Sequence, residues 1–335
     1  MASSRPSVFL LGVGYIGNNV LDSLLVAKYS VTALVRQAEQ ASVLKKAGAK
    51  TVLGTLADLQ LITAQTSQHE ITINTANCDD LPSVEAILAG VKQRIAAGKP
   101  STYLHTSGTG ELEDGALGMY KNDKIYRDDV REDIDAIPPT SMHRHVDNTI
   151  VKAAGEFGDK AKIVIILPPI IYGYIPAHNR LSFATKSLVR FNIKHGFAGY
   201  VGEGRNVWNV VHVKDLGRAY MILLEYMEKS TPETFLENPY FFVENGAEIT
   251  MKEGAENIAQ ILHGLGKIQD LKVQPFSDSD YADVFGPMTP TALGSNARSR
   301  AVRLRKLGWE PKETDIWTSW KADEVPAILA ALESE

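Results

Sequence analysis

The chain has 335 residues, of which 44% are hydrophobic and 22% are charged, values typical of a globular protein with one large domain or two smaller ones. A formal net charge of -5 argues against a nucleic-acid-binding surface, and no apolar run approaches the roughly 18 residues of a membrane span. The single cysteine, Cys78, excludes an internal disulfide and a cysteine-rich metal site. We therefore expect a cytoplasmic protein that binds neither nucleic acid nor membrane and holds no metal.

Short apolar runs alternate with segments of helical periodicity through the first two thirds of the chain. Continuous apolar strands joined by helices are typical of a parallel sheet that is buried on both faces. Crossovers between parallel strands are nearly always right-handed, so the sequence predicts an α/β fold with a Rossmann-type doubly wound parallel sheet. The predicted strands cover 7–11, 30–35, 51–54, 71–76, 102–107 and 162–169, and the helices between them include 16–29 and 83–98.

The regular alternation ends after residue 173, where a smaller and discontinuous C-terminal substrate lobe is predicted. The segments expected in this part of the chain are helices over 182–196, 215–229 and 250–265 and a strand over 239–245. The domain boundaries that we predict are 1–175 plus about 206–230 for the nucleotide-binding domain, and about 176–205 plus 231–335 for the substrate lobe.

Three aromatic residues in this second part, Trp208, Phe241 and Phe242, favour a pocket for a small-molecule substrate. The basic run 298–306 is interpreted as the solvated face of a helix. Cys78 follows the fourth predicted strand and is expected to be a small buried residue. The sequence leaves open whether two copies of the chain pair into a homodimer.

Three glycines form a G-x-G-x-x-G pattern between the first predicted strand and the first predicted helix. Gly12 permits the tight turn, Gly14 lets a pyrophosphate approach the backbone, and Gly17 allows the helix to pack closely on the strand. The N-terminus of the helix then faces the phosphates. This turn, with Tyr15 and Ile16 between its glycines, is therefore predicted to bind a dinucleotide.

The end of the second predicted strand bears on which dinucleotide is bound. NAD binders usually place an Asp or Glu there, about 20 residues after the glycines, for the ribose hydroxyls. This chain has no acid from Ser30 to Ala38, and Arg36 stands at the tip of the strand. A guanidinium suits a 2′-phosphate, so the sequence favours NADP(H), although Arg36 also fits an ordinary surface position.

Five segments carry recognisable motifs in a fixed order: "LLGVGYIG" at the glycine turn, "INTAN" (73–77), "YLHTSGTG" (103–110), "ILPPIIYG" (166–173) and "NVWNVVHVKDLGRAYMILLE" (206–225). Together they resemble the atypical and extended short-chain dehydrogenase/reductases, the NAD(P)-dependent epimerase/dehydratase superfamily. The spacing before Gly14 is one residue shorter than in most extended members and matches atypical branches. The resemblance implies further cofactor contacts from Thr75, Ala76, Pro168 and Ile171.

The resemblance also locates the family's catalytic groups, and here the chain departs from the pattern. In active members a Tyr-x-x-x-Lys pair supplies the proton-transferring phenol and the lysine that binds the nicotinamide ribose. Lys152 matches the lysine, but Asn148 stands in the tyrosine position, where an amide cannot act as a general acid. Gly108 stands where the family has its catalytic hydroxyl, with Ser107 and Thr109 on either side.

Several residues could replace the missing acid. Tyr120 opens the formal match "YKNDK", in a segment that is more typical of a loop than of a helix. Tyr172 and Tyr174 lie near the expected nicotinamide position, and His143 and His145 lie at the start of the helix that carries Lys152. A bound water is a further alternative, and the pattern does not select one of them.

Three functions are therefore compatible with the sequence. The first is an NADP(H)-dependent oxidoreductase, similar to carbonyl reductases, that acts on a small organic substrate. The second is a non-catalytic NADP-binding redox sensor similar to NmrA-like proteins, and the third is an isomerase or lyase on the same fold. The predicted second lobe favours the enzyme, because a separate lobe beside the cofactor is typical of a substrate pocket.

Overall fold

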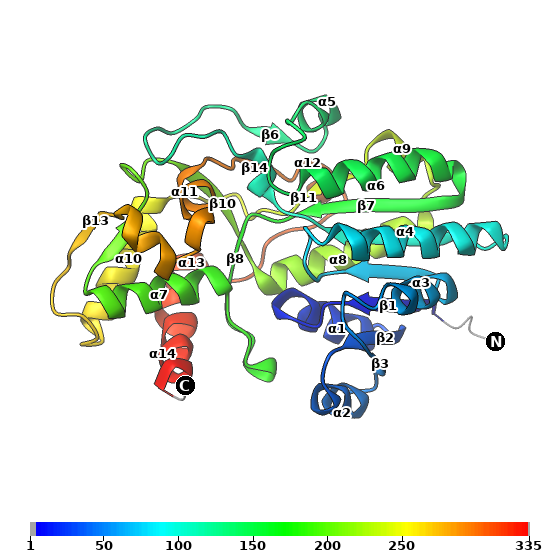
Figure 1. Cartoon of the computed structure of the whole chain (residues 1–335), viewed down its shortest axis with the longest axis horizontal. Coiled ribbons are helices and arrows are strands. Elements are labelled where there is room, and N and C mark those ends of the chain that lie inside the picture. Colours follow the sequence, from blue (N-terminus) through cyan, green and yellow to red (C-terminus); the bar gives the residue numbers. More distant parts are fainter. Residues whose placement is uncertain (1–4, 334–335) are drawn as a thin grey trace.

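A seven-stranded parallel sheet dominates the computed structural model, which describes residues 5–333 of the chain (Figure 1). The strand order is β11-β7-β5-β4-β1-β2-β3, so the order reverses at β1 as in doubly wound nucleotide-binding folds. The predicted α/β fold class is therefore confirmed, and all six predicted strands lie in this sheet. The strands are β1 (Ser7–Leu11), β2 (Ser30–Val35), β3 (Lys50–Leu53), β4 (Ile71–Asn74), β5 (Ser101–Thr106), β7 (Ala161–Leu167) and β11 (Tyr240–Phe242).

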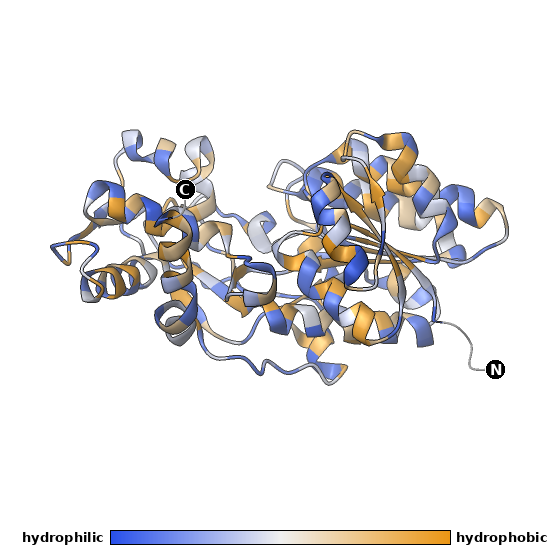
Figure 2. Cartoon of the chain, turned by 90° about the horizontal axis from the view of Figure 1, so that it is seen from below, coloured by the Kyte–Doolittle hydropathy of each residue, from blue (hydrophilic) through white to orange (hydrophobic). Residues whose placement is uncertain are grey.

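Helices cover both faces of the large sheet, which explains why its strands are continuous apolar runs. On one face α1 packs against α8, and on the other α3 packs against α4 and α4 against α6. Figure 2 shows mostly hydrophobic strands between helices of mixed hydropathy. The helices of this part are α1 (Tyr15–Val26), α2 (Ala38–Lys46), α3 (Leu59–Gln68), α4 (Leu81–Ala96), α5 (Arg131–Asp135), α6 (Arg144–Phe157), α8 (Val213–Lys229) and α9 (Glu233–Glu237).

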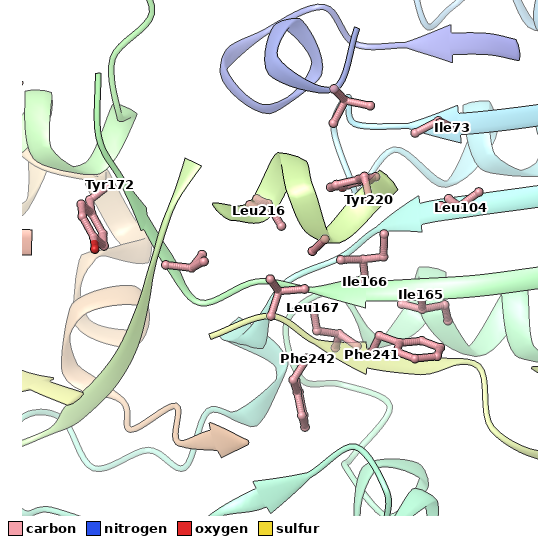
Figure 3. Packing of buried hydrophobic residues seen from close by; sticks show 14 of the residues in the cluster. Ile73, Leu104, Ile165, Ile166, Leu167, Tyr172, Leu216, Tyr220, Phe241 and Phe242 are labelled. Atoms are coloured by element: carbon pink, nitrogen blue, oxygen red, sulfur yellow. The ribbon is translucent and has the colours of Figure 1, made fainter. Parts of the chain in front are cut away.

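Helix α8 lies on one face of the sheet, and its first half packs against the carboxyl ends of the central strands. Its side chains Leu216 and Tyr220 are buried and point toward strands β5 and β7 (Figure 3). The Thr106 hydroxyl at the end of β5 donates a hydrogen bond to the Asn74 carbonyl at 2.6 Å, and it also bonds to the Tyr220 hydroxyl. These buried polar contacts fix the ends of β4 and β5 relative to α8.

The second lobe is built on small sheets and lies beside the large one (Figure 1). A three-stranded sheet has the order β12-β10-β8, and β13 pairs with β9, while β14 and β6 form a short parallel pair. Its strands are β6 (Tyr126–Arg127), β8 (Ile170–Tyr172), β9 (Ala198–Tyr200), β10 (Val207–His212), β12 (Glu248–Thr250), β13 (Val273–Pro275) and β14 (Ser299–Arg300). Its helices are α7 (Phe183–His195), α10 (Met251–Gly264), α11 (Thr289–Gly294), α13 (Ile316–Ser319) and α14 (Val325–Glu333), whereas α12 (Val302–Lys306) packs against β11 of the large sheet. Within residues 5–333, no helix combines the length and the apolar character that crossing a membrane requires.

The boundary between the two parts differs from the predicted one at two strands. Strand β11 joins the large sheet beside β7, so Phe241 and Phe242 are core residues and not pocket residues (Figure 3). Strand β10 joins the small sheet beside β8, although the sequence pattern grouped it with the nucleotide-binding domain. In both cases a short apolar strand is buried by pairing with a neighbouring strand. The order of the strands in the chain does not predict which sheet each of them joins.

The basic run 298–306 is not a solvated helix face, and that interpretation is wrong. Arg298 and Arg300 both donate to the Glu248 carboxylate at 2.8 Å. Arg303 is partly buried and donates to the carbonyls of Asn238 and Tyr240. The arginines therefore tie the C-terminal segment to both sheets.

The Asp128 carboxylate supports the same connection and gives a test of the fold. It is buried and accepts backbone hydrogen bonds from Phe242, Val302 and Arg303 at 2.8–3.1 Å. We predict that Asp128→Ala lowers the free energy of unfolding by about 3 kcal/mol or more, because three N–H groups, one buried and two partly buried, lose their acceptor. Urea denaturation measures the change.

The neighbouring residue provides the control. Asp129 forms a surface ion pair with Arg127 at 2.9 Å, and such pairs contribute about 0–1 kcal/mol. Asp129→Ala should therefore change stability little, and an equal loss in both variants would contradict the anchoring role of Asp128.

Candidate active site

Five segments converge at the carboxyl edge of the large sheet. The first three follow strands β1, β4 and β5, whose ends lie side by side in the sheet. Ligands of open α/β sheets bind at the point where the strand order reverses, which here lies between β1 and β4. The segments are 12–17, 75–79, 107–111, 143–152 and 168–173.

The glycine turn after β1 interlocks with the segment after β4. Gly12 has φ of +88°, and a Cβ atom on it would lie 2.4 Å from the Ala76 nitrogen. A Cβ atom on Gly17 would lie 1.8 Å from the Gly12 carbonyl oxygen. The Thr75 hydroxyl donates to that same oxygen at 2.7 Å, so the turn leaves no room for side chains at either glycine.

Gly14 differs from its two neighbours, because a Cβ atom on it would meet no protein atom within 4 Å. Gly14 is the N-cap of α1, so the free backbone N–H groups of the first helical turn lie next to this open space. A helix N-terminus beside an open glycine backbone is a site for an anionic phosphate. The turn therefore fits the pyrophosphate of a dinucleotide, as the sequence pattern predicts.

The tip of β2 carries no carboxylate in the position typical of NAD binders. Arg36 directly follows β2 and is exposed, and Glu39 lies beyond it in the first turn of α2. The Gln40 amide of this turn donates to the Val13 carbonyl at 3.2 Å, which connects α2 to the glycine turn. Arg36 is thus placed beside the turn, where it could hold a 2′-phosphate.

A hydrogen bond connects the glycine turn to the "PPIIYG" segment of the second part. The Tyr15 hydroxyl donates to the Gly173 carbonyl at 2.5 Å, and the Gly173 N–H donates to Glu324 at 3.0 Å. Glu324 is buried in the π-helical turn Trp320–Glu324, and burial raises its pKa to about 7. No sequence motif points to Glu324, because it lies 151 residues away from its partner.

The hydroxyl groups beside Gly108 are both directed into the protein. The Ser107 hydroxyl donates to the Asp147 carboxylate at 2.6 Å, and both residues are buried. Thr109 is also buried, and its backbone N–H donates to the Pro168 carbonyl at 3.0 Å. Ser107 thus joins β5 to α6, and Asp147 is a site residue that the sequence analysis missed.

Asp147 belongs to a buried polar group at the start of α6. His105 Nε2 lies 3.7 Å from its carboxylate, and Glu111 lies 3.4 Å from the Arg144 guanidinium. Burial raises the pKa of Asp147 to about 6, and burial together with the Asp147 charge raises the pKa of Glu111 well above its usual value. Because all four side chains are buried, this group holds the helix start firmly against β5.

Asn148 and Lys152 lie one turn apart on α6, as the family pattern requires. Asn148 is half-buried, next to the residue that binds Ser107, whereas Lys152 is exposed. Their positions are compatible with a ribose-binding lysine and an amide at the tyrosine position.

The tyrosines considered as replacement acids are engaged elsewhere. Tyr120 is exposed and lies in a segment without helix, so "YKNDK" does not form a Tyr-x-x-x-Lys face. The Tyr172 hydroxyl donates to the Thr314 carbonyl at 2.8 Å, and Tyr174 donates to the Asn179 side chain at 3.1 Å.

His143 is brought together with two residues that follow β4. It is the N-cap of α6 in a left-handed conformation, with φ of +68°. Its Nδ1 atom lies 2.8 Å from the Asp79 carboxylate and 3.3 Å from the Cys78 sulfur. Cys78 is therefore a half-buried partner of His143, and its interpretation as a buried core residue is wrong. The other histidine considered, His145, is exposed in the first turn of α6.

A cavity of about 190 Å³ lies within the second lobe. Ile170 of β8, two residues after Pro168, lines it, and so does Trp208, as expected from the sequence. The lining is apolar and comes from several elements, including Leu188, Tyr200, Ile258 and Trp320. Trp320 lies in the same π-helical turn as Glu324, which connects this cavity to the segment beside the glycine turn.

No protein-family model matches the chain. Among curated proteins, the chain is 28% identical to the oxidase UcsJ of an Acremonium species, in an alignment that covers 95% of this chain and 98% of that protein. It is 25% identical to an uncharacterized protein of Schizosaccharomyces pombe, with 94% and 98% covered.

Solved structures of similar fold cover almost the whole chain. A UDP-glucose 4-epimerase of Thermotoga maritima with UDP-glucose has a TM-score of 0.66 at 16% identity, with 97% of this chain and 99% of that chain covered. The yeast methylglyoxal/isovaleraldehyde reductase Gre2 complexed with NADPH has a TM-score of 0.60 at 16% identity, with 98% and 100% covered. The chain therefore shares the fold of these two enzymes, which is the fold that the resemblance seen in the sequence implies.

The open space at Gly14 gives a direct test of dinucleotide binding. We predict that Gly14→Val abolishes NADPH binding and leaves the chain folded, because the branched side chain would occupy the space of the pyrophosphate. Titration calorimetry measures the affinity, and circular dichroism measures the fold. Gly155→Val is the control, since Gly155 also has open space beside it but lies near the end of α6. Equal NADPH affinity in both variants would contradict the assignment.

Proposed function

We propose that this protein is an NADP(H)-dependent oxidoreductase that reduces the carbonyl group of a small apolar organic substrate. The observation that carries the proposal is the glycine turn, where open space at Gly14 meets the N-terminus of α1. The NADPH-bound reductase of similar fold and the relative named as an oxidase support a redox reaction on this scaffold.

The proposed cofactor site is formed by four segments of the nucleotide-binding part together with the segment 168–171 of the second part. The backbone of the glycine turn binds the pyrophosphate, and Tyr15 and Ile16 lie at the start of α1 beside it. Lys152 binds the nicotinamide ribose from α6. The residues assigned to this site are Gly12, Gly14, Tyr15, Ile16, Gly17, Arg36, Thr75, Ala76, Lys152, Pro168 and Ile171.

Arg36 makes NADP(H) the preferred cofactor in this proposal. Its guanidinium is exposed at the tip of β2, and no carboxylate precedes Glu39 there to bind a free ribose hydroxyl or to repel a phosphate. A guanidinium binds a phosphate with two parallel hydrogen bonds, which a lysine cannot do.

For carbonyl reduction the protein must orient the substrate beside the cofactor and supply one proton to the substrate oxygen. A bound reduced nicotinamide supplies the hydride when it is present. The half-buried Asn148 amide can donate a hydrogen bond to the substrate oxygen from the position of the usual tyrosine. Ser107 and Thr109 hold the end of β5 in place through Asp147 and Pro168.

The substrate class follows from the cavity in the second lobe. Its lining of Leu188, Trp208, Ile258 and Trp320 offers hydrocarbon and aromatic surface. A pocket of this composition binds an apolar group by removing it from water and offers little to a charged one. We therefore expect aldehydes and ketones with an aliphatic or aromatic tail.

A second candidate function is a redox sensor that binds NADP(H) without catalysis. The observation that favours it is Asn148, since the residue at the tyrosine position cannot transfer a proton. The two candidates differ in whether bound NADPH is consumed.

The test is NADPH oxidation by purified protein over a series of aldehydes and ketones of increasing tail length. We predict turnover that rises with tail length, and a loss of at least tenfold in kcat/KM in Lys152→Ala, because the ribose loses a charge-assisted contact. Lys160→Ala, which removes an exposed lysine just beyond α6, is the matched control. Tight NADPH binding without oxidation by any carbonyl would favour the sensor.

Cofactor selectivity is tested by Arg36→Ala. A charge-assisted contact to phosphate contributes about 1.5–3 kcal/mol, so NADPH affinity should fall at least tenfold while NADH affinity stays the same. Lys46→Ala, at the other end of α2, should change neither affinity. Equal affinities of the wild type for NADPH and NADH would contradict the role of Arg36.

A further inference from the structure

We propose that His143 is the proton donor of this site and replaces the tyrosine that the helix lacks. The proposal rests on the proposed function, because it assigns the source of the proton in a carbonyl reduction. It is based on how the histidine ring is held, on where its free nitrogen points and on the charges around it.

The His143 ring is held by a carboxylate on one side. Its Nδ1 atom lies 2.8 Å from an Asp79 oxygen, which can only accept, so Nδ1 carries a proton. The left-handed backbone conformation of His143, with φ of +68°, is uncommon for a residue with a side chain. Asp79 thus orients the ring and leaves Nε2 as the nitrogen that can face a substrate.

The Nε2 atom points at the loop after β5. It lies 3.4 Å from the position that a Cβ atom of Gly108 would take and 3.1 Å from that of Gly110. Among residues 5–333, no hydrogen-bond partner of Nε2 is found. The imidazole therefore stands over the backbone position where the related enzymes carry their hydroxyl, and glycine at 108 and 110 leaves room for it.

The charges around the ring favour the cationic form. The titratable groups that act on His143 are Cys78 and Asp79 after β4, His105 on β5 and Asp147 on α6, while His145 acts on Asp79. Burial lowers the pKa of His143, but the hydrogen bonds with Asp79 and Cys78 outweigh burial and raise the pKa to about 10. At neutral pH the ring is an imidazolium with a proton to donate from Nε2.

The proton balance of the reaction is simple. The carbonyl carbon gains a hydride from the reduced nicotinamide, and the carbonyl oxygen takes the proton from His143 Nε2. The products are the alcohol, the oxidised nicotinamide and a neutral imidazole. Solvent then returns a proton to the ring, whose side chain is 14% exposed and whose partner Asp79 is 41% exposed.

A binding experiment tests the position of the ring independently of activity. The NMR titration of His143 in the full chain is followed alone, with NADP⁺ and with adenosine 2′,5′-bisphosphate, which lacks the nicotinamide. We expect NADP⁺ to lower the midpoint by about one pH unit, because the cationic ring repels the imidazolium, and the bisphosphate to leave it unchanged. The same midpoint with both ligands would overturn the proposal.

Kinetics test the proton transfer itself. His143→Asn keeps a residue that tolerates the left-handed conformation and should lower kcat for carbonyl reduction about 100-fold or more, with unchanged NADPH affinity. The control His263→Asn changes an exposed histidine at the end of α10. Asp79→Asn removes the charge that favours the imidazolium, so the fall of kcat/KM at high pH should begin at lower pH. If Asp79 had a purely structural role, the pH at which kcat/KM begins to fall would stay the same.

The outcomes separate the two proposals. Wild-type turnover in His143→Asn, or an unchanged pH dependence of kcat/KM in Asp79→Asn, overturns the role of His143. Neither result contradicts the proposed reductase function. Activity that a chelator removes and Zn²⁺ restores also overturns it, since Cys78, Asp79 and His143 would then be metal ligands. Tight NADPH binding without turnover of any carbonyl overturns both proposals.

Discussion

The hydrogen bond from Tyr15 to the Gly173 carbonyl is the interaction on which the proposed site depends. It joins the glycine turn after β1 to the segment after β7, although β4 and β5 separate these strands in the sheet. The two loops therefore lie across the carboxyl ends of β4 and β5, and any ligand on the glycine turn has this segment as a neighbour. Glu324 holds the other side of Gly173, so the C-terminal lobe takes part in the same connection.

Buried polar groups hold the helices and strands around this connection in place. Asp147 fixes the start of α6 to Ser107, which directly follows β5, and Asp128 fixes the C-terminal segment to β11. Each buried carboxylate accepts hydrogen bonds from residues far away in the chain, and losing such an acceptor costs more than losing a surface ion pair. The result is a rigid scaffold that presents His143, Asn148 and Lys152 from a single helix.

The sequence predicted the sheet well because each of its strands is a local apolar run and its glycine turn is a local motif. It predicted the site less well, since the partners that define it are distant in the chain. Cys78 and His143 are 65 residues apart, and Gly173 and Glu324 are 151 apart. Hydrophobic periodicity is a local property of the sequence and does not predict contacts between residues so far apart in the chain. The same reason explains β11, whose three residues give no signal of the sheet that they join.

The most direct measurement of the central claim follows a deuterium atom. Wild-type protein would reduce an apolar aldehyde with NADPH that carries deuterium on one face of nicotinamide C4, and mass spectrometry would locate the label. Hydride transfer in a site of fixed geometry predicts one deuterium on the alcohol carbon from only one of the two labelled forms of NADPH. Product without deuterium from either form, or with deuterium from both, would contradict the account.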